Sequence, residues 1–172
     1  MNSENENMQT LMILRHAKAE PWYPGVNDFH RHLSEIGKEH AQKVAAWMCE
    51  KIEPPESILC SPSQRTRETL SPLLAINSEL EPATRFESEI YGGSSSTLRS
   101  LLDFEFAESG RVLIVGHNPG FEMLVFDIIA PSQYNKIRRL ATGTLVVVDF
   151  EEGWDTGLGQ GILREKVRGK KL

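Results

Sequence analysis

The run RVLIVG at residues 111–116 restricts the possible folds of this chain more than any other segment. Four aliphatic residues in succession, followed directly by the turn-forming residues HNPG, are typical of a short strand that is buried on both faces. Such strands occur in sheets that helices cover on both sides. The run therefore favours an α/β fold.

Apolar runs of this kind alternate with helical patterns along the rest of the chain. In one such pattern the residues at i, i+4 spacing are Ile36, His40, Val44 and Met48, as on one face of a helix. Ser34 is in position to cap this helix. We expect strands at residues 9–15, 57–60, 82–87, 111–116, 143–150 and 161–167, and helices at residues 34–52, 61–76, 97–107 and 121–129. The alternation predicts a three-layer α/β/α fold with a mostly parallel central sheet, in which the last two strands pair antiparallel. We expect one domain over residues 9–172 after a disordered start at residues 1–8.

The second helical pattern, SPSQRTRETLSPLLAI, begins with a clear start signal. Ser61 is in position to cap the helix, Pro62 takes the first helical position and Gln64 the third, as in a capping box. Pro72 is expected to kink or divide this helix.

Composition and charge argue against several classes of function. The chain has 172 residues and a net charge of −5, which disfavours broad binding of nucleic acid or of an anionic membrane. The polar start MNSENENMQT lacks the features of a secretory signal, and no apolar run approaches the roughly 20 residues that cross a bilayer. With Cys49 and Cys60 both expected as buried free thiols, the sequence predicts a cytoplasmic protein.

Three of the predicted strands end in a cation or a histidine. Arg15 and His16 follow the first strand. Arg65 lies just beyond the second, near the start of a helix, and His117 directly follows RVLIVG. Because sites in open α/β sheets form beyond the carboxyl ends of strands, these side chains are expected to meet at one edge. Guanidinium donors match phosphate oxygens, and a helix N-terminus adds N–H groups, so the set suits a phosphoryl group. Arg67 cannot share the helix face of Arg65, which we therefore prefer.

The two histidines can divide the work of phosphoryl transfer. One must be neutral to attack phosphorus with a free lone pair, and nearby arginines disfavour its charged form. The other can remain a donor to the phosphoryl oxygens. Each residue also has a purely structural interpretation: Arg65 can pair with Glu68, His117 can be a turn residue, and an Arg-His pair often occurs by chance. The joint placement at three strand ends favours a site.

Three segments, LRHAKAE, LCSPSQRTRETL and VGHNPGFEML, resemble the three motifs of the histidine phosphatase (phosphoglycerate-mutase-like) superfamily. The resemblance is strongest to the SixA-type phosphohistidine phosphatase branch and extends, in order, over nearly the whole chain. It implies that His16 is the nucleophile and that Arg15, Arg65 and His117 bind phosphate. Asn118, next to His117, is added as a further phosphate ligand. The resemblance also implies a three-layer α/β/α fold and no metal or other cofactor.

The chain departs from the family pattern in two places. It reads Arg-His-Ala, as is common in the SixA-type branch, where many superfamily members have Arg-His-Gly. In place of the branch's RPL it has RHL, so that Arg31 matches the family arginine and is expected to border the site. His30 and His32 form an H-x-H that can ligate a metal, but without a nearby set of acids or cysteines we expect none.

The general acid is the functional residue that the sequence identifies least well. The mutase and acid-phosphatase branches supply a carboxylic acid to the leaving oxygen, and Glu89, in ESEIYGG, is the best positional match. If the substrate is phosphohistidine, the leaving group departs as neutral imidazole once its other ring nitrogen is protonated. An alkoxide needs a positioned acid far more. The sequence therefore favours N–P over O–P substrates.

Together these features predict a metal-independent phosphatase that hydrolyses phosphohistidine on a partner protein through a covalent intermediate on His16. The chain has no long insertion that forms a lid, and an open site is compatible with a phosphorylated side chain on another protein. Three alternatives stay open. They are a small-molecule phosphomonoesterase acting on a phosphorylated metabolite, a mutase, and a phosphate- or phosphoprotein-binding module with little turnover.

Overall fold

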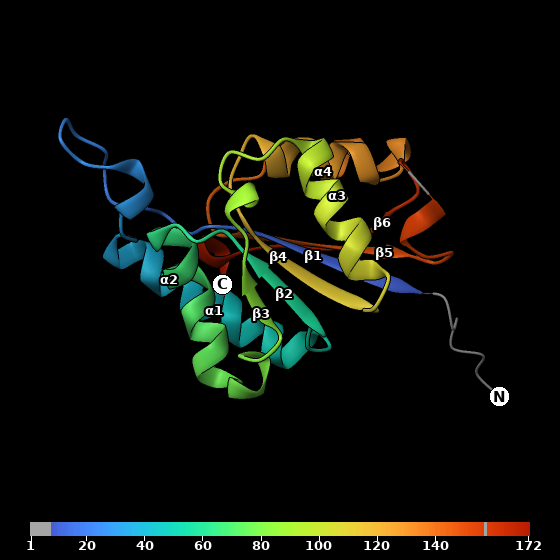
Figure 1. Ribbon diagram of the computed structural model, residues 1–172, viewed down its shortest axis with the longest axis horizontal. Coiled ribbons are helices and arrows are strands. Elements are labelled where there is room, and N and C mark those ends of the chain that lie inside the picture. Colours follow the sequence, from blue (N-terminus) through green and yellow to red (C-terminus); the bar gives the residue numbers. More distant parts are fainter. Residues whose placement is uncertain (1–7, 157) are drawn as a thin grey trace.

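A six-stranded sheet between two layers of helices forms the described part of the chain (Figure 1). The structure, a computed structural model, describes residues 8–156 and 158–172. The strands are β1 (Gln9–Arg15), β2 (Ser57–Cys60), β3 (Thr84–Phe86), β4 (Arg111–Gly116), β5 (Thr144–Phe150) and β6 (Ile162–Arg168). The α-helices are α1 (Glu35–Lys51), α2 (Gln64–Ile76), α3 (Ser95–Phe106) and α4 (Gly120–Ile128). These elements confirm the predicted α/β/α class.

The strand order places β1 and β4 at the centre of the sheet. The order is β3-β2-β4-β1-β5-β6. β1 pairs with β4, β4 with β2 and β2 with β3 in parallel, whereas β5 runs antiparallel to both β1 and β6. The sheet is thus mostly parallel, and its last two strands pair antiparallel, as predicted. Residues that follow β1 and β4 leave the sheet side by side, since Arg15 lies opposite Gly116 in the register.

Alternate residues of the central strands pack against opposite helical layers. Met12 packs with Val44 in the cluster under α1 and α2, whereas Ile13 packs with Leu124 in the cluster under α3 and α4. Each of these side chains is at most 1% exposed, and burying one contributes about 1.5–3 kcal/mol to stability. The two clusters hold the carboxyl ends of β1 and β4 in fixed positions.

The start of α2 differs from the prediction. The helix begins at Gln64 and its N-cap side chain makes no capping hydrogen bond, so Ser61 is not the cap and Pro62 precedes the helix. Ser61 instead continues the path of β2: its N–H donates to β4 (2.9 Å), and its hydroxyl lies 2.8 Å from His117 Nε2. The expected capping box is therefore wrong, and Arg65 becomes the second residue of the helix.

Pro72 does not divide α2, which continues as one helix to Ile76. A proline removes one backbone hydrogen bond from a helix. Leu70 and Leu73, on either side of Pro72, are 1% and 3% exposed. Their packing on the sheet keeps the helix continuous across the proline.

The two cysteines differ in their surroundings. Cys60, in β2, is buried, and burial raises the pKa of its thiol to about 12. Cys49 is exposed on α1, so the expectation that both are buried is wrong for this residue. Its neighbour Met48 occupies the core-facing position of the helix instead.

No helix within residues 8–156 and 158–172 combines the length and the apolar character that a membrane crossing requires. The predicted disordered start at residues 1–8 lies, apart from Met8, outside the described residues.

The segment between β1 and α1, residues 17–33, leaves the edge of the sheet and projects from the body of the molecule (Figure 1). We call it the site loop. Its base is fixed by the Lys18 carbonyl oxygen, which accepts a hydrogen bond from the Ser34 N–H (2.9 Å). A Cβ on Gly37 would lie 2.0 Å from the same oxygen. Glycine in the first turns of α1 therefore allows the loop to pack against the helix.

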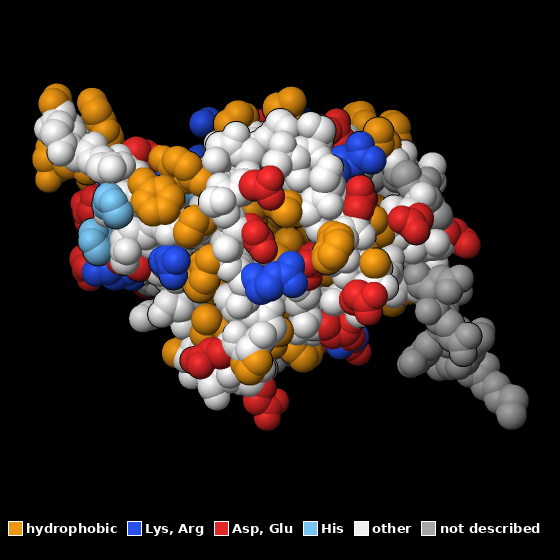
Figure 2. All heavy atoms as spheres, viewed as in Figure 1, with side chains coloured by type: hydrophobic (Ala, Val, Ile, Leu, Met, Phe, Trp, Pro, Cys, Tyr) orange, Lys and Arg blue, Asp and Glu red, His pale blue; other side chains and the backbone are white. Residues whose placement is uncertain are grey.

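The tip of the site loop carries exposed aromatic side chains (Figure 2). Trp22 is 57% and Tyr23 63% exposed. The turn is ordered by hydrogen bonds from the Val26 N–H to the Tyr23 oxygen (3.1 Å) and from Trp22 Nε1 to the Val26 oxygen (3.1 Å). The loop thus presents two aromatic rings on a defined turn beyond the sheet edge.

Candidate active site

The carboxyl ends of β1 and β4 bring two histidines together. The His16 N–H donates to the Gly116 oxygen (3.0 Å), which extends the pairing of the two strands by one residue. The ring centroids of His16 and His117 lie 5.2 Å apart, and the two residues are 7% and 8% exposed. Two histidines from distant parts of the sequence therefore form one buried pair.

His16 has a defined tautomer. Its Nδ1 lies 2.7 Å from the Ala17 carbonyl oxygen. Because a carbonyl oxygen only accepts, Nδ1 carries the proton and Nε2 keeps a free lone pair. Burial is the main cause that lowers the pKa of His16 to about 4; the hydrogen bond to Ala17 opposes it, and the charges of Arg65 and Arg15 add to it. The ring is thus neutral near pH 7, with burial contributing more than the arginines that the sequence analysis emphasised.

His117 offers a buried donor to the same space. Its Nε2 lies 2.8 Å from Ser61 Oγ, and its Nδ1 is buried without a partner. Burial, followed by the neighbouring His16 and Arg65, lowers the pKa of His117 to about 3. In the tautomer in which the Ser61 hydroxyl donates to Nε2, Nδ1 carries the proton and can donate to an anionic oxygen.

Three arginines near this pair share one pattern of contacts. Arg15 Nη1 donates to the Leu140 oxygen (2.7 Å). Arg65 donates through Nη1 to the Asp28 backbone oxygen (2.7 Å) and through Nη2 to Asp28 Oδ2 (3.0 Å). Arg31 Nη2 donates to Asp28 Oδ1 (2.9 Å). In all three the Nε–H is buried and unpaired. Buried donors without partners are rare in folded proteins, so their number here indicates an anion-binding site.

Sequence reasoning missed Asp28 and Tyr91. Asp28 lies in a 3₁₀ turn of the site loop (Asp28–His30) and also accepts a hydrogen bond from the Tyr91 hydroxyl (2.7 Å). The Tyr91 ring stands edge-on to His117, with 5.3 Å between ring centroids. The one sequence signal for Asp28 was its position three residues before Arg31, and that spacing alone does not show that the loop returns to the sheet edge.

The predicted ligand Asn118 has its amide donor engaged elsewhere. Nδ2 donates to the Leu140 oxygen (2.9 Å) and to Glu122 Oε2 (3.2 Å). The Leu140 oxygen also accepts from Arg15, so Asn118 helps to hold the segment that orients this arginine. Its role as a phosphate ligand stays a prediction.

Glu89 lies in a 3₁₀ turn (Ser88–Ile90) and is exposed. It borders a hollow with Arg85 and Glu105. Across residues 8–156 and 158–172, no side-chain hydrogen bond or ion pair joins it to His16 or His117. Its role as general acid stays a prediction.

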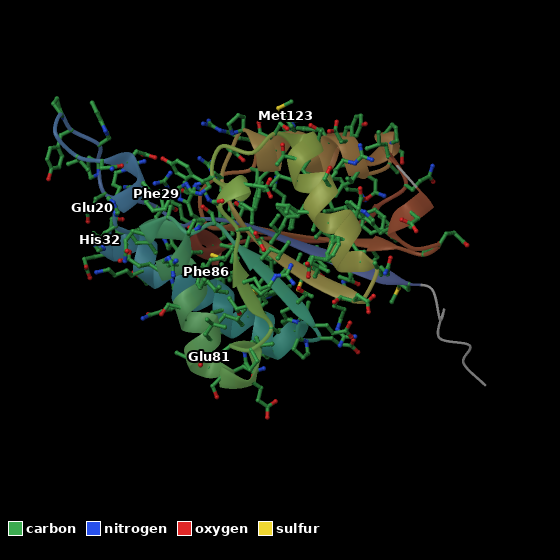
Figure 3. The ribbon with its side chains drawn as sticks, in the orientation of Figure 1. Glu20, Phe29, His32, Glu81, Phe86 and Met123 are labelled. Atoms are coloured by element: carbon green, nitrogen blue, oxygen red, sulfur yellow. The ribbon has the colours of Figure 1, made fainter. Side chains whose placement is uncertain are left out.

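Other polar residues near the site have structural partners. His32, labelled in Figure 3, extends from the site loop. Its Nδ1 lies 2.5 Å from Glu68 Oε1, so Glu68 pairs with the site loop and not with Arg65. Arg67 stacks its guanidinium over the Phe86 ring at 3.8 Å, outside the arginine set. Among the described residues, no three His, Cys, Asp or Glu side chains gather as a metal site around His32 or elsewhere.

Both histidines should stay neutral when the pH falls to about 5.5, because their pKa values lie below the ordinary 6.5. Ring chemical shifts in an NMR titration measure this directly. The unfolded chain binds these protons near pH 6.5, whereas the folded protein does so only near pH 4 or below. The free energy of unfolding should therefore decrease as the pH falls through this range. Titration of both rings near 6.5 would contradict the described burial.

Comparison with known protein families agrees with this geometry. The family described as the histidine phosphatase superfamily (branch 1) matches residues 11–94, which include most of β1 and the whole of the site loop, β2 and α2. Curated relatives from Mycobacterium tuberculosis, named as uncharacterized proteins, are 27% identical over 107 residues, or 62% of this chain. The chain spans 63% of the length of these relatives.

Solved structures share the fold over nearly the whole chain. A SixA protein from Nakamurella multipartitia, named as a presumed phosphohistidine phosphatase, has a TM-score of 0.81 and 24% identity, covering 94% of this chain and 96% of that one. A SixA protein from Agrobacterium tumefaciens, named in the same way, has a TM-score of 0.77 and 27% identity, covering 92% and 97%. A presumed alpha-ribazole-5'-P phosphatase from Escherichia coli has a TM-score of 0.66 and 16% identity, covering 92% and 95%. These matches, together with the paired histidines at the ends of the central strands, show that the chain is similar to the histidine phosphatase superfamily and shares its fold with SixA-type proteins.

Proposed function

We propose that the protein is a phosphatase that forms a covalent phosphohistidine intermediate on His16. One observation carries the proposal: the free Nε2 lone pair of a neutral, buried His16 lies among arginines whose Nε–H groups are buried and unpaired. Such a set provides a nucleophile together with fixed positive charge for phosphoryl oxygens. The N-terminus of α2, with Arg65 as its second residue, adds partial positive charge.

The reaction follows from the orientation of His16. Nε2 attacks phosphorus in line while the bond from phosphorus to the leaving atom breaks, and the leaving atom takes that electron pair. The Nδ1 proton stays on its hydrogen bond to the Ala17 oxygen. Arg15, Arg65 and the Nδ1 of His117 donate to the phosphoryl oxygens as negative charge develops. Water then attacks phosphorus, the bond to Nε2 breaks, and the water proton leaves with the phosphate product.

The substrate class proposed is phosphohistidine. The carboxyl group with direct contacts in the site is that of Asp28, which both Arg65 and Tyr91 bind. Burial alone would raise the pKa of Asp28, but the hydrogen bond from Tyr91 and the charge and hydrogen bond of Arg65 outweigh it and hold the pKa below its ordinary value. An ionised carboxylate cannot protonate a departing alkoxide. Imidazole, protonated on its other nitrogen, leaves without such help.

The site loop favours a protein as the carrier of that phosphohistidine. Residues Asp28 and Arg31 of the loop lie in the site, whereas Trp22 and Tyr23 are exposed to solvent. Figure 2 shows hydrophobic side chains on the projecting part of the molecule. A small phosphorylated molecule held by the arginines would not need this projecting tip. A folded partner that inserts a phosphorylated side chain would contact it, and exposed Trp and Tyr are frequent binding anchors.

Replacing both aromatic residues, Trp22→Ala with Tyr23→Ala, should lower kcat/KM about tenfold on a folded protein that carries phosphohistidine. On free phosphohistidine the rate should stay unchanged. The matched control is Phe104→Ala, which removes another exposed aromatic ring (77% exposed) from α3. Equal losses on both substrates, or equal losses in the control, would remove the loop tip from substrate binding.

A second candidate is a small-molecule phosphomonoesterase with the same covalent step, because the fold is shared with the presumed alpha-ribazole-5'-P phosphatase. The two candidates are separated by kcat/KM on phosphohistidine peptide, phosphoserine peptide and sugar phosphate, with His16→Ala as the blank. We expect phosphohistidine to be preferred over sugar phosphate by at least about 100-fold. A preference for the sugar phosphate would favour the second candidate, and no turnover of any substrate would reject both.

A further inference from the structure

The Asp28 carboxylate connects two arginines of the site. Its Oδ1 accepts from Arg31 Nη2 (2.9 Å), and its Oδ2 accepts from Arg65 Nη2 (3.0 Å) and from the Tyr91 hydroxyl (2.7 Å). Its backbone oxygen accepts from Arg65 Nη1 (2.7 Å). One loop residue therefore receives four hydrogen bonds from three side chains.

The hydrogen bonds that hold Arg65 and Arg31 come from the terminal nitrogens, Nη1 and Nη2, of each guanidinium group. A guanidinium has five N–H donors, one on Nε and two on each terminal nitrogen. Asp28 takes both terminal nitrogens of Arg65. In Arg31 it takes Nη2, and the Glu20 backbone oxygen takes Nη1 (3.1 Å). The Nε–H of both arginines stays buried and unpaired. Asp28 thus binds both terminal nitrogens of Arg65 and one of Arg31, and the Nε–H of each arginine stays free.

We infer that Asp28 is a positioning residue, which holds Arg65 and Arg31 so that both Nε–H groups serve the phosphoryl group. The inference rests on the proposed phosphatase function. Without the carboxylate, the end of each long side chain could rotate, and ordering it again would reduce the gain from each hydrogen bond to phosphate. Asp28 acts through the arginines and transfers no proton.

The charges at this corner fit the same role. With His16 and His117 neutral, the three arginines Arg15, Arg31 and Arg65 together with Asp28 carry a net positive charge of about two. Glu122, Arg139 and Arg168 also act on Arg15, and their charges leave this corner positive. A phosphoryl dianion matches this charge. An alternative is that the Asp28 carboxylate itself occupies the phosphate position. In that case it would accept from the Nε–H groups of the arginines, but these groups have no partner.

Binding of inorganic phosphate tests the inference without requiring turnover. Asp28→Asn keeps the shape of the side chain and removes its charge, and we expect it to weaken phosphate binding, measured by calorimetry, about tenfold. Asp28→Ala serves as the second variant, and thermal melting shows whether each variant is folded. The matched control is Asp103→Asn on α3, whose carboxylate accepts a hydrogen bond from Trp154 Nε1 (2.5 Å) and should leave phosphate binding unchanged.

NMR of the arginine Nε–H groups provides a readout that a merely structural role would not change. In the wild type, the signals of Arg65 and Arg31 should be rigid and should shift on addition of phosphate. In Asp28→Asn they should become mobile while the protein stays folded. Unchanged or tighter phosphate binding in folded Asp28→Asn would overturn the positioning role. A wild type that binds no phosphate would overturn both this inference and the proposed function.

Discussion

His16→Ala should lower kcat/KM on phosphohistidine by about 10⁴-fold or more, because the variant lacks the atom that forms the covalent intermediate. The remaining arginines and His117 can still bind phosphate, so phosphate affinity should change much less than turnover. Both quantities are measured on the same preparation, by steady-state kinetics and by calorimetry.

The control for this substitution is His30→Ala, which removes an exposed histidine of the site loop. Its kcat/KM should stay within about twofold of the wild type, since surface substitutions of this kind rarely matter. His16→Ala should remain folded. The change removes a buried imidazole that burial already disfavours in its charged form, so no charged partner is left unpaired. A folded His16→Ala variant with substantial turnover would contradict the assignment of the nucleophile.

Arg65→Ala has the second largest expected effect, a loss of about 100- to 1,000-fold in kcat/KM. Its side chain is 7% exposed, so its charge acts on the phosphoryl group with little screening by water. The substitution also removes the hydrogen bond from Nη2 to the Asp28 carboxylate and the hydrogen bond from Nη1 to the Asp28 backbone oxygen. Arg65→Lys should recover little, because an ammonium group lacks the planar fork that contacts Asp28 and phosphate together.

Arg67→Ala is the matched control, two residues further along the same helix. Arg67 donates from Nε to the Pro62 oxygen (2.9 Å) and stacks on Phe86, so its loss should change kcat/KM by no more than a few-fold. If both arginine variants lose activity equally, the loss reflects the overall positive charge near the site, and the assignment of a specific role to Arg65 is wrong.

The fold could be predicted from the sequence because its signals are local. The aliphatic run of β4 and the apolar face of α1 each indicate an element within a short window. The predicted start of α2 was wrong because it depends on a contact that is distant in the sequence. The hydroxyl of Ser61 binds His117, and this partner lies 56 residues away in the sequence. Local capping preferences contain no information about such a contact.

Some residues of the candidate site could likewise be predicted from local signals, and others could not. His16 and His117 follow strand ends, so the rule for parallel sheets predicted that they meet, and their rings do lie 5.2 Å apart. Asp28 lies in a loop whose path depends on contacts with Arg65 and Tyr91, which come from α2 and from the end of a 3₁₀ turn. No periodicity marks such a residue. Asp28 reaches the site because the loop returns to the carboxyl end of the sheet, where Arg65 binds it.

The central claim, a covalent intermediate on His16, is tested most directly by trapping that intermediate. The wild-type protein is mixed briefly with a ³²P-labelled phosphodonor, quenched in alkali and digested, and the labelled peptide is identified by mass spectrometry. The proposal predicts an acid-labile, alkali-stable phosphate on the peptide that contains His16, and no label in His16→Ala. Persistent labelling of the His16→Ala protein, or label carried by another residue in the wild type, would contradict it.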